Sequence, residues 1–232
     1  MATSAPPTCR AGMSILLGGL ACAWLFVGAA AGEQRAISVA TPATPIRWSA
    51  AAGGLMQLVD PWGDEGKAAL LKRMAQEDRF DLAKRMQQHL LEALAKRGRL
   101  ALPLDLQRPP ELSPGPLPRD RLPETALPGS LIDVSVEWFG VHRSGALEAY
   151  RPMVAASFRV LGPNGALEQS TRRILFNVPS DLAAGGEAIA AGSGCEWKSF
   201  DELRRERARL WGCMDGALEQ VADRIGQHVE GP

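Results

Sequence analysis

The chain has 232 residues, with 26 Lys and Arg against 26 Asp and Glu, so its formal net charge is zero. A nucleic-acid-binding protein usually carries a basic patch or stripe, and this balance argues against that class. The basic residues are also interleaved with acids, as in residues 201–207, which is typical of a solvated helix face.

The first 32 residues have the pattern of an export signal. Arg10 is followed by the uncharged residues 11–32, which have an apolar centre and end with the small residues Ala29-Ala30-Ala31. A positive start, an apolar middle and a small-residue exit are typical of a secretory signal peptide. We therefore predict a signal peptide over residues 1–31, cleaved after Ala31, and a periplasmic or secreted location. Residues 32–232 are long enough to form a single domain.

Two alternatives for this N-terminal segment stay open. If residues 11–32 remain uncut, they are long enough to span a bilayer and would anchor the protein to the inner membrane. This is the route by which we expect membrane contact, if there is any. A lipid anchor on Cys22 is the least favoured alternative, because Leu20 lies one position too close to that cysteine and the apolar run continues beyond it.

The four cysteines divide between the export segment and the rest of the chain. Cys9 and Cys22 belong to the former, so Cys195 and Cys213 are the pair left after cleavage. An even pair in an oxidising compartment predicts a disulfide. Two buried free thiols are the alternative. A redox role is disfavoured, because the two cysteines are too far apart in sequence to resemble a Cys-x-x-Cys motif.

The first half of the chain predicts a short strand and a long helical region. Residues 36–40 alternate apolar and small polar side chains, as a strand does. Residues 64–97 predict helix, with a break near residues 77–79, and Gly98 suits a left-handed helix cap. An apolar stripe runs along the second half of this region through Leu82, Met86, Leu90 and Leu94.

Eight prolines fall within residues 103–128. Proline fixes the backbone φ angle and lacks the N–H donor, so this segment cannot be regular helix or central strand. We interpret it as an extended connector within the domain, in preference to a proline-rich segment that binds a partner.

Residues 130–178 have the period-two alternation of strands. A turn signal, Gly162-Pro163-Asn164-Gly165, separates two of the three runs. Residues 199–229 predict the last helix, with a capping box formed by Ser199 and Glu202. The predicted fold class is therefore α+β, with a mainly antiparallel sheet (meander 130–178) and two long amphipathic helices packed on one of its faces.

No catalytic motif is found in the sequence. His89, His142 and His228 fall in separate elements, without the local spacing of a metal site. Asp133 and Glu137 share one face of the first long strand, and we expect them to face water, while Trp138 alternates with the core residues. We therefore predict no catalytic, cofactor-binding or metal-binding residues.

The order of elements from Phe80 to the C-terminus resembles that of uncharacterised exported bacterial proteins of the lipoprotein-like kind. The likeness runs through residues 149–154, the Gly162–Gly165 turn, residues 174–177, Trp197 and the Leu-rich C-terminal helix. It implies a helix, a meander and a C-terminal helix in one pair of layers, and it brings no catalytic residues.

Three functions are compatible with these patterns. The favoured one is a non-enzymatic envelope module that binds another envelope protein and needs no cofactor. The second is a carrier or sensor of a small apolar ligand, in a pocket lined by Trp138 and Phe158 between sheet and helices. The least favoured is an exported hydrolase, in which Asp133, Glu137 or His142 would converge in a cleft.

Overall fold

The computed structural model describes residues 36–43, 47–52, 61–106, 129–145, 148–162, 166–179 and 185–229. The predicted signal peptide (1–31), its anchor alternative (11–32) and most of the proline-rich segment (107–128) lie outside these residues. The described residues form a seven-stranded sheet and four helices, which confirms the α+β class.

The elements follow one another along the chain as β1 (Ile37–Ala40), β2 (Arg47–Ala52), α2 (Pro61–Glu77), α3 (Leu82–Lys96), β3 (Ala101–Leu104), β4 (Ser130–Arg143), β5 (Arg151–Leu161), β6 (Leu167–Phe176), β7 (Glu187–Ile189), α4 (Phe200–Arg205) and α5 (Arg207–Val229). The strand order is β3-β1-β4-β5-β6-β7, and β2 also pairs with β4.

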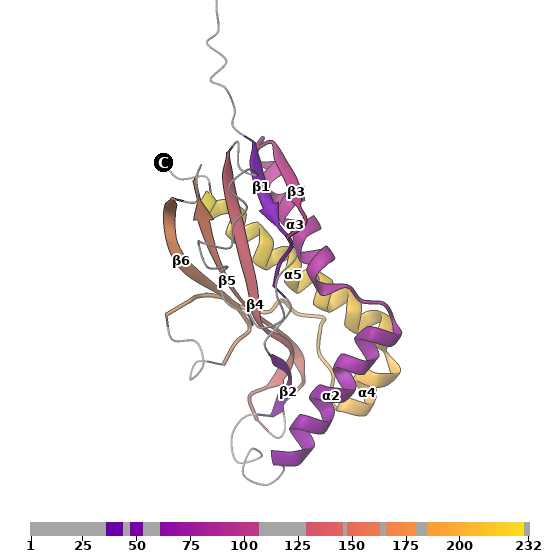
Figure 1. Cartoon of the computed structure of the whole chain (residues 1–232). Helices are drawn as coiled ribbons and strands as arrows, with labels where there is room; N and C mark the ends of the chain where they lie inside the picture. Colours follow the sequence, from indigo (N-terminus) through magenta and orange to yellow (C-terminus); the bar gives the residue numbers. More distant parts are fainter. Residues whose placement is uncertain are drawn as a thin grey trace, which may run out of the picture. The chain divides into compact units, whose positions relative to one another are not determined.

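The sheet is mixed, so the prediction of a mainly antiparallel sheet was wrong. β4, β5 and β6 do pair antiparallel in chain order. However, β1 runs parallel to both β3 and β4, β2 runs parallel to β4, and β7 runs parallel to β6. The meander β4-β5-β6 therefore forms the centre of the sheet (Figure 1). β1 and β2 pair with β4, β3 pairs with β1, and β7 pairs with β6 at the other side.

The strand β3 lies at the start of the segment that we interpreted as a connector. It contains Pro103, whose partner in β1 is Val39. β3 is the last strand on this side of the sheet, and proline is tolerated on an edge strand because its missing N–H can face away from the ladder. The prediction that residues 103–128 contain no central strand therefore agrees with β3. The interpretation of this segment as a connector was wrong for its first residues, which belong to an edge strand.

A bulge in β4 changes which side chains face the helices. The register with β5 shifts between Val136 and Trp138. After the shift, Phe139 is fully buried in the main core and Trp138 is only half-buried, so the expected core position of Trp138 was wrong. Beside it, a Cβ on Gly140 would lie 1.9 Å from the backbone oxygen of Ser49, so the close approach of β2 requires glycine here.

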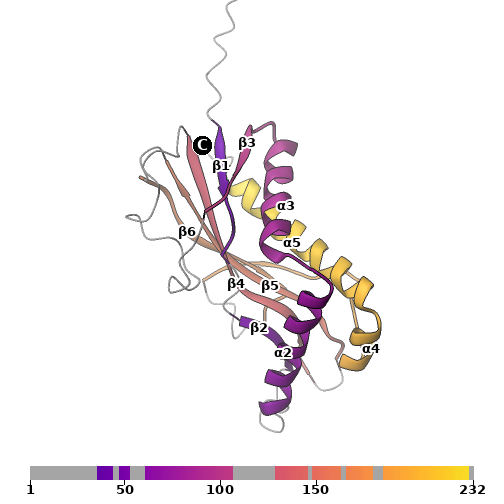
Figure 2. The same cartoon turned by 45° about the vertical axis from the view of Figure 1, so that its right-hand side comes forward.

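The helices gather on one side of the sheet, as two views show (Figures 1 and 2). α5 packs on β5 and β6, α3 packs on β1 and β3, and α2 packs on β2. A series of aromatic contacts joins the layers: Trp48 meets Phe139 at 5.2 Å between ring centroids, Phe139 stacks on Phe80 at 5.8 Å, and Phe80 stacks on Trp211 at 4.8 Å. Sheet and helices thus share one packed core.

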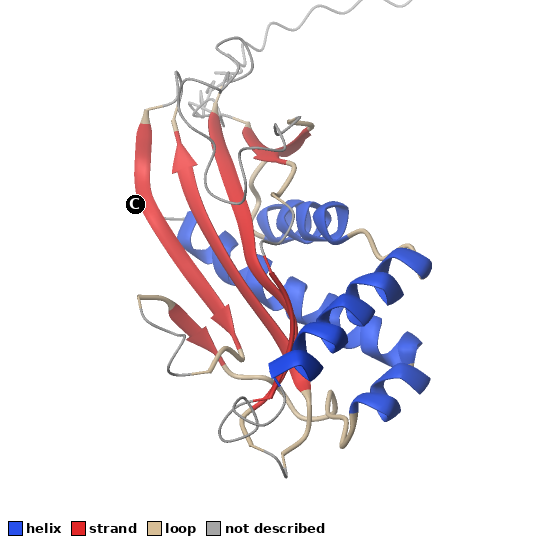
Figure 3. Cartoon of the chain, turned by 60° about the horizontal axis from the view of Figure 1, so that its bottom comes forward, coloured by secondary structure: helices blue, strands red, loops and turns tan. Residues whose placement is uncertain are grey.

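The helical region is interrupted where the sequence predicts a break (Figure 3). α2 ends at Glu77 and α3 begins at Leu82, and Arg79 between them has a φ of 55°. Asp81 caps α3, because its side chain accepts a hydrogen bond from the backbone N–H of Lys84 at 3.0 Å. Gly98 follows α3 with a φ of 70°. The whole predicted stripe of α3 is buried.

The last predicted helix consists of two helices. Ser199 caps α4 by accepting from the backbone N–H of Glu202 at 3.1 Å, as predicted, while the Glu202 carboxylate accepts from the N–H of Lys198 at 2.7 Å. The helix then breaks at Glu206, and α5 begins at Arg207. Glu206 and Arg207 contact different neighbours: Glu206 bonds to Trp197, and Arg207 bonds to Asp78.

Ion pairs join α3 to α5. Asp215 accepts from His89 Nε2 and from Arg85, both at 3.0 Å, and Asp223 accepts from Arg97 at 2.9 Å. Burial alone would raise the pKa of Asp215, but the hydrogen bonds from His89 and Arg85 outweigh it and lower this pKa. The hydrogen bond from Arg97 lowers the pKa of Asp223. Both carboxylates are therefore held in the charged form.

These lowered pKa values predict that the protein loses stability in acid. The unfolded chain binds protons at Asp near pH 4, whereas folded Asp215 and Asp223 bind them only at lower pH. Their contribution is therefore complete above about pH 4 and is lost as the pH falls from there through the folded-state pKa values. Urea unfolding at pH 6 and at pH 3 should show a smaller difference for Asp215→Asn/Asp223→Asn than for the wild type.

Gln88→Ala, at an exposed uncharged side chain of α3, is the control for this comparison and should leave the difference between the two pH values as in the wild type, because it removes no titratable group. An equal pH dependence in the wild type and in the double variant would contradict the assignment of acid sensitivity to the α3–α5 contacts.

Candidate functional site: an arginine groove and a disulfide-bounded cavity

The predicted acids lie on the sheet face that points away from the core, but they do not face water. Asp133 is 1% exposed, and its Oδ2 accepts from Arg159 Nε and Nη2 at 3.2 and 3.1 Å. Glu137 is half-buried, and its Oε2 accepts from Arg173 Nε and Nη2 at 3.1 and 2.7 Å. Arg173 stands on β6, so this second pair spans β5.

Each of these carboxylates therefore binds an arginine of another strand of the sheet. His142 is buried further along β4, where it pairs across the ladder with Arg151. Asp133 and Glu137 thus belong to cross-strand ion pairs, and His142 lies further along the same strand. Within the described ranges, no three His, Cys, Asp or Glu side chains gather as metal ligands.

The other two histidines belong to separate ion-pair clusters. His89 joins α3 to Asp215 of α5. His228, near the end of α5, bonds through Nε2 to Glu187 at 2.6 Å and through Nδ1 to Arg172 at 2.8 Å. An arginine can only donate, so Nδ1 accepts and Nε2 carries the proton. The hydrogen bond from His228 lowers the pKa of Glu187. This cluster ties the edge strand β7 to α5.

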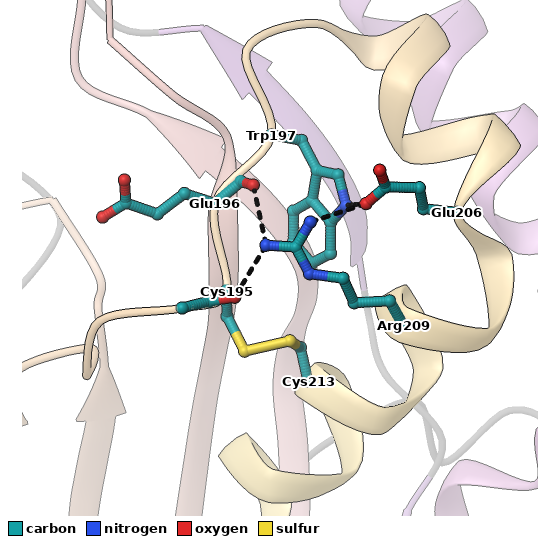
Figure 4. The surroundings of a disulfide bond; sticks show 7 residues. Cys195, Glu196, Trp197, Glu206, Arg209 and Cys213 are labelled. Atoms are coloured by element: carbon teal, nitrogen blue, oxygen red, sulfur yellow. Dashed lines mark hydrogen bonds and ion pairs between the residues drawn. A yellow bond between two sulfur atoms is a disulfide. The ribbon is translucent and has the colours of Figure 1, made fainter.

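The predicted disulfide is confirmed. Cys195 and Cys213 are bonded, with 5.8 Å between their Cα atoms, and the bond fastens the segment before α4 to the first half of α5 (Figure 4). Arg209 strengthens the same attachment: it donates to Glu206 at 2.6 Å and to the Gly194 oxygen at 2.8 Å, and it lies over the Trp197 ring.

Trp197 stands at the centre of this attachment and is fully buried. It exchanges backbone hydrogen bonds with Tyr150 at 2.7 and 3.0 Å, and its Nε1 donates to Glu206 at 3.2 Å. Figure 4 shows Glu206 at the Nε1 edge of the indole and the Arg209 guanidinium over the ring. Trp197 thus connects the segment before α4 to the sheet.

A cavity of about 410 Å³ lies beside the disulfide. It is bounded by the start of β5, the end of β6, the segment 191–195 and one face of α5, and its walls include Phe176, both bonded cysteines, Gly212 and Gly216. A Cβ added to either of these glycines would meet nothing within 4 Å. The hollow is therefore left open by small residues. Neither Trp138 nor Phe158, the expected pocket residues, lines it.

A larger groove of about 670 Å³ lies between α2 and α4, which stand side by side in two views (Figures 1 and 2). Its floor is apolar and consists of Leu70 and the buried Met74. Its walls carry six charged side chains: Arg73, Glu77, Asp201, Arg204, Arg205 and Arg207. We call this surface the arginine groove.

One end of the arginine groove is closed by hydrogen bonds across the helices. Arg207 donates from Nε to Asp78 at 2.7 Å and from Nη2 to Glu77 at 2.9 Å, and Trp211 donates to the same Asp78 at 2.6 Å. Burial alone would raise the pKa of Asp78, but the bonds from Trp211 and Arg207 outweigh it and lower this pKa. The helix break explains the geometry: Glu206 turns toward Trp197, and Arg207 turns toward α2.

Two arginines of the groove, Arg73 and Arg205, are exposed and could bind a partner. Arg204 pairs with Asp201 at 3.4 Å, and Arg207 is engaged as described. Neither Arg73 nor Arg205 has an ion-pair or hydrogen-bond partner in the described part of the chain. Neither arginine was predicted as a functional residue: the charges of residues 201–207 were interpreted as a solvated helix face, and Arg73 was not singled out. The groove could not be predicted locally, because α2 and α4 are more than a hundred residues apart in the sequence and meet only in the folded protein.

Neither a protein-family model nor a curated protein matches this chain. None of the described helices combines the length and the apolar character needed to cross a membrane.

Proposed function

We propose that this protein is an exported, non-enzymatic binding module that docks another envelope protein in the arginine groove. The observation that carries the proposal is the pair Arg73 and Arg205, which are exposed on facing helices above an apolar floor. Partner-binding surfaces typically combine an apolar centre with a polar rim, and arginine is enriched in them. The disulfide and the N-terminal export pattern support a periplasmic or secreted location.

Site-specific photo-crosslinking in cells tests this proposal. A photoreactive amino acid at position 201, on the α4 wall of the groove, should give a discrete protein adduct, and the adduct should disappear when Arg73→Glu is added. The matched control is the same amino acid at Arg99, an exposed position in the connection between α3 and β3, which should give no such adduct. Identical patterns from positions 201 and 99, or no adduct from position 201, would reject the groove as a docking surface.

The cavity beside the disulfide favours a second candidate function, the binding of a small apolar molecule. Its volume is in the range of ligand pockets, and its lining is mainly small or apolar with Gln220, Ser193 and Arg209 among the polar residues. The Arg209 guanidinium is neutralised by Glu206, so the site suits an uncharged molecule.

Filling the cavity tests this candidate. Gly216→Leu should abolish the fluorescence increase of the uncharged dye Nile red, because the new side chain occupies the hollow. Gly66→Leu in α2 is the matched control, since a Cβ there also meets nothing within 4 Å. Both substitutions should stabilise the helices by up to about 1 kcal/mol. Equal dye binding by the two variants would exclude this cavity as the site.

A further inference from the structure

We infer that the segment docked in the arginine groove is acidic, with at least one apolar side chain between its acids. This inference rests on the proposed function and names the chemistry of the partner. The lining has four arginines and two acids, and both acids are already paired with arginines of the groove itself, Glu77 with Arg207 and Asp201 with Arg204. The charge left for a partner is therefore positive.

The two available guanidinium groups come from different elements. Arg73 stands on α2 and Arg205 on α4, so a segment lying between the helices would meet one arginine on each wall. A guanidinium binds a carboxylate through two parallel hydrogen bonds, which makes arginine a geometric as well as an electrostatic match for Asp or Glu. Two carboxylates on opposite sides of one segment would satisfy both walls.

The apolar floor of the groove indicates that the partner segment has an apolar side chain between its two carboxylates. Leu70 is half-buried and Met74 is 3% exposed, and methionine adapts its shape to different apolar neighbours. An apolar side chain inserted from the partner would cover the exposed part of the floor. A flat anionic membrane surface would reach the exposed arginines without filling the groove, so the concave shape favours a protein segment.

A synthetic peptide tests this chemistry directly. The probe is a short rhodamine-labelled peptide that alternates glutamate and leucine, added to the protein recovered after export, with binding followed by fluorescence anisotropy. Saturable binding is expected, and it should weaken as salt is raised because the charges are exposed. The same peptide with glutamine in place of glutamate should bind at least about tenfold more weakly.

Charge reversal locates the site. Arg73→Glu and Arg205→Glu should each weaken binding by about tenfold or more, since like charges then face each other. Arg99→Glu is the matched control and should bind as the wild type does. The double variant Arg73→Glu/Arg205→Glu should gain binding to the peptide that has lysine in place of glutamate. This gain shows that the variant is folded and that the effect comes from charge.

Three results would overturn the inference. Equal binding of the glutamate and glutamine peptides would show that the groove selects apolar side chains alone. Arginine-dependent binding to phosphatidylglycerol vesicles, without binding to the peptide, would show that the groove meets a lipid surface. A partner crosslinked at position 201 together with no binding of the acidic peptide would leave the docking proposal standing and refute the acidic partner.

Discussion

Replacing both Cys195 and Cys213 by serine is expected to lower the free energy of unfolding by about 3 kcal/mol. In the chain-entropy model a disulfide stabilises by restricting the unfolded chain, and a loop of roughly this length corresponds to that value. The bonded residues are 18 apart in the sequence. The effect should be large because the bond also holds the segment that carries the fully buried Trp197.

Urea unfolding of the oxidised wild type and of the double serine variant measures this difference. Reduction of the wild type with dithiothreitol should give the same loss, and it should have no effect on the variant. An unfolding midpoint that is unchanged by either treatment would show that Arg209 and the Tyr150–Trp197 bridge hold the segment without the disulfide.

Removing one member of the buried pair Asp133–Arg159 is expected to cost about 3–5 kcal/mol. Arg159→Met would leave the Asp133 carboxylate, which is 1% exposed, without the guanidinium that donates to it from the neighbouring strand. The double change Asp133→Leu/Arg159→Met should recover most of the loss, because well-packed apolar side chains can replace a buried ion pair at little net cost. Thermal or urea unfolding of these two variants, of Asp133→Leu and of the wild type forms a double-mutant cycle.

The matched control for this cycle is the exposed pair Lys96–Glu219, at 3.3 Å. Lys96→Met should change stability by about 1 kcal/mol or less, as is usual for exposed pairs. If Arg159→Met were no more damaging than Lys96→Met, the polar face of the sheet would be contributing little to the stability of the fold.

Much of the fold could be predicted because its signals are local. The stripe of α3, the break before it and the glycine after it depend on residues near one another in sequence, and so does the Ser199 cap. The disulfide could be predicted because the export segment leaves one pair of cysteines. The long strands β4 and β5 alternate apolar with polar or small side chains, and β6 ends in the apolar run Ile174-Leu175-Phe176.

The missed features depend on contacts between distant residues. β2 is rich in alanine and β7 has three residues, so neither has the composition of a strand, and each is held by its pairing with a longer neighbour. The bulge that leaves Trp138 half-buried could not be predicted, because the alternation of apolar and polar residues in β4 continues without interruption through it. Asp133 was expected to face water because strand alternation shows on which face of the sheet a side chain lies. It does not show what covers that face.

The candidate site was missed for a related reason. Arg73 and Arg205 each look like ordinary exposed helix residues, and only the packing of α2 beside α4 makes them two walls of one groove. A binding module stays a prediction, made from the pattern of export and the lack of a catalytic motif. The surface that would perform that function follows from the tertiary fold.

An NMR titration of the isotopically labelled protein with the glutamate–leucine peptide tests docking at the arginine groove most directly. We expect changes in backbone amide chemical shifts that are concentrated in α2, α4 and the first turn of α5. These changes should disappear in Arg73→Glu/Arg205→Glu. Changes concentrated at the disulfide-bounded cavity or on the polar face of β4, β5 and β6, with the groove amides unaffected, would contradict it.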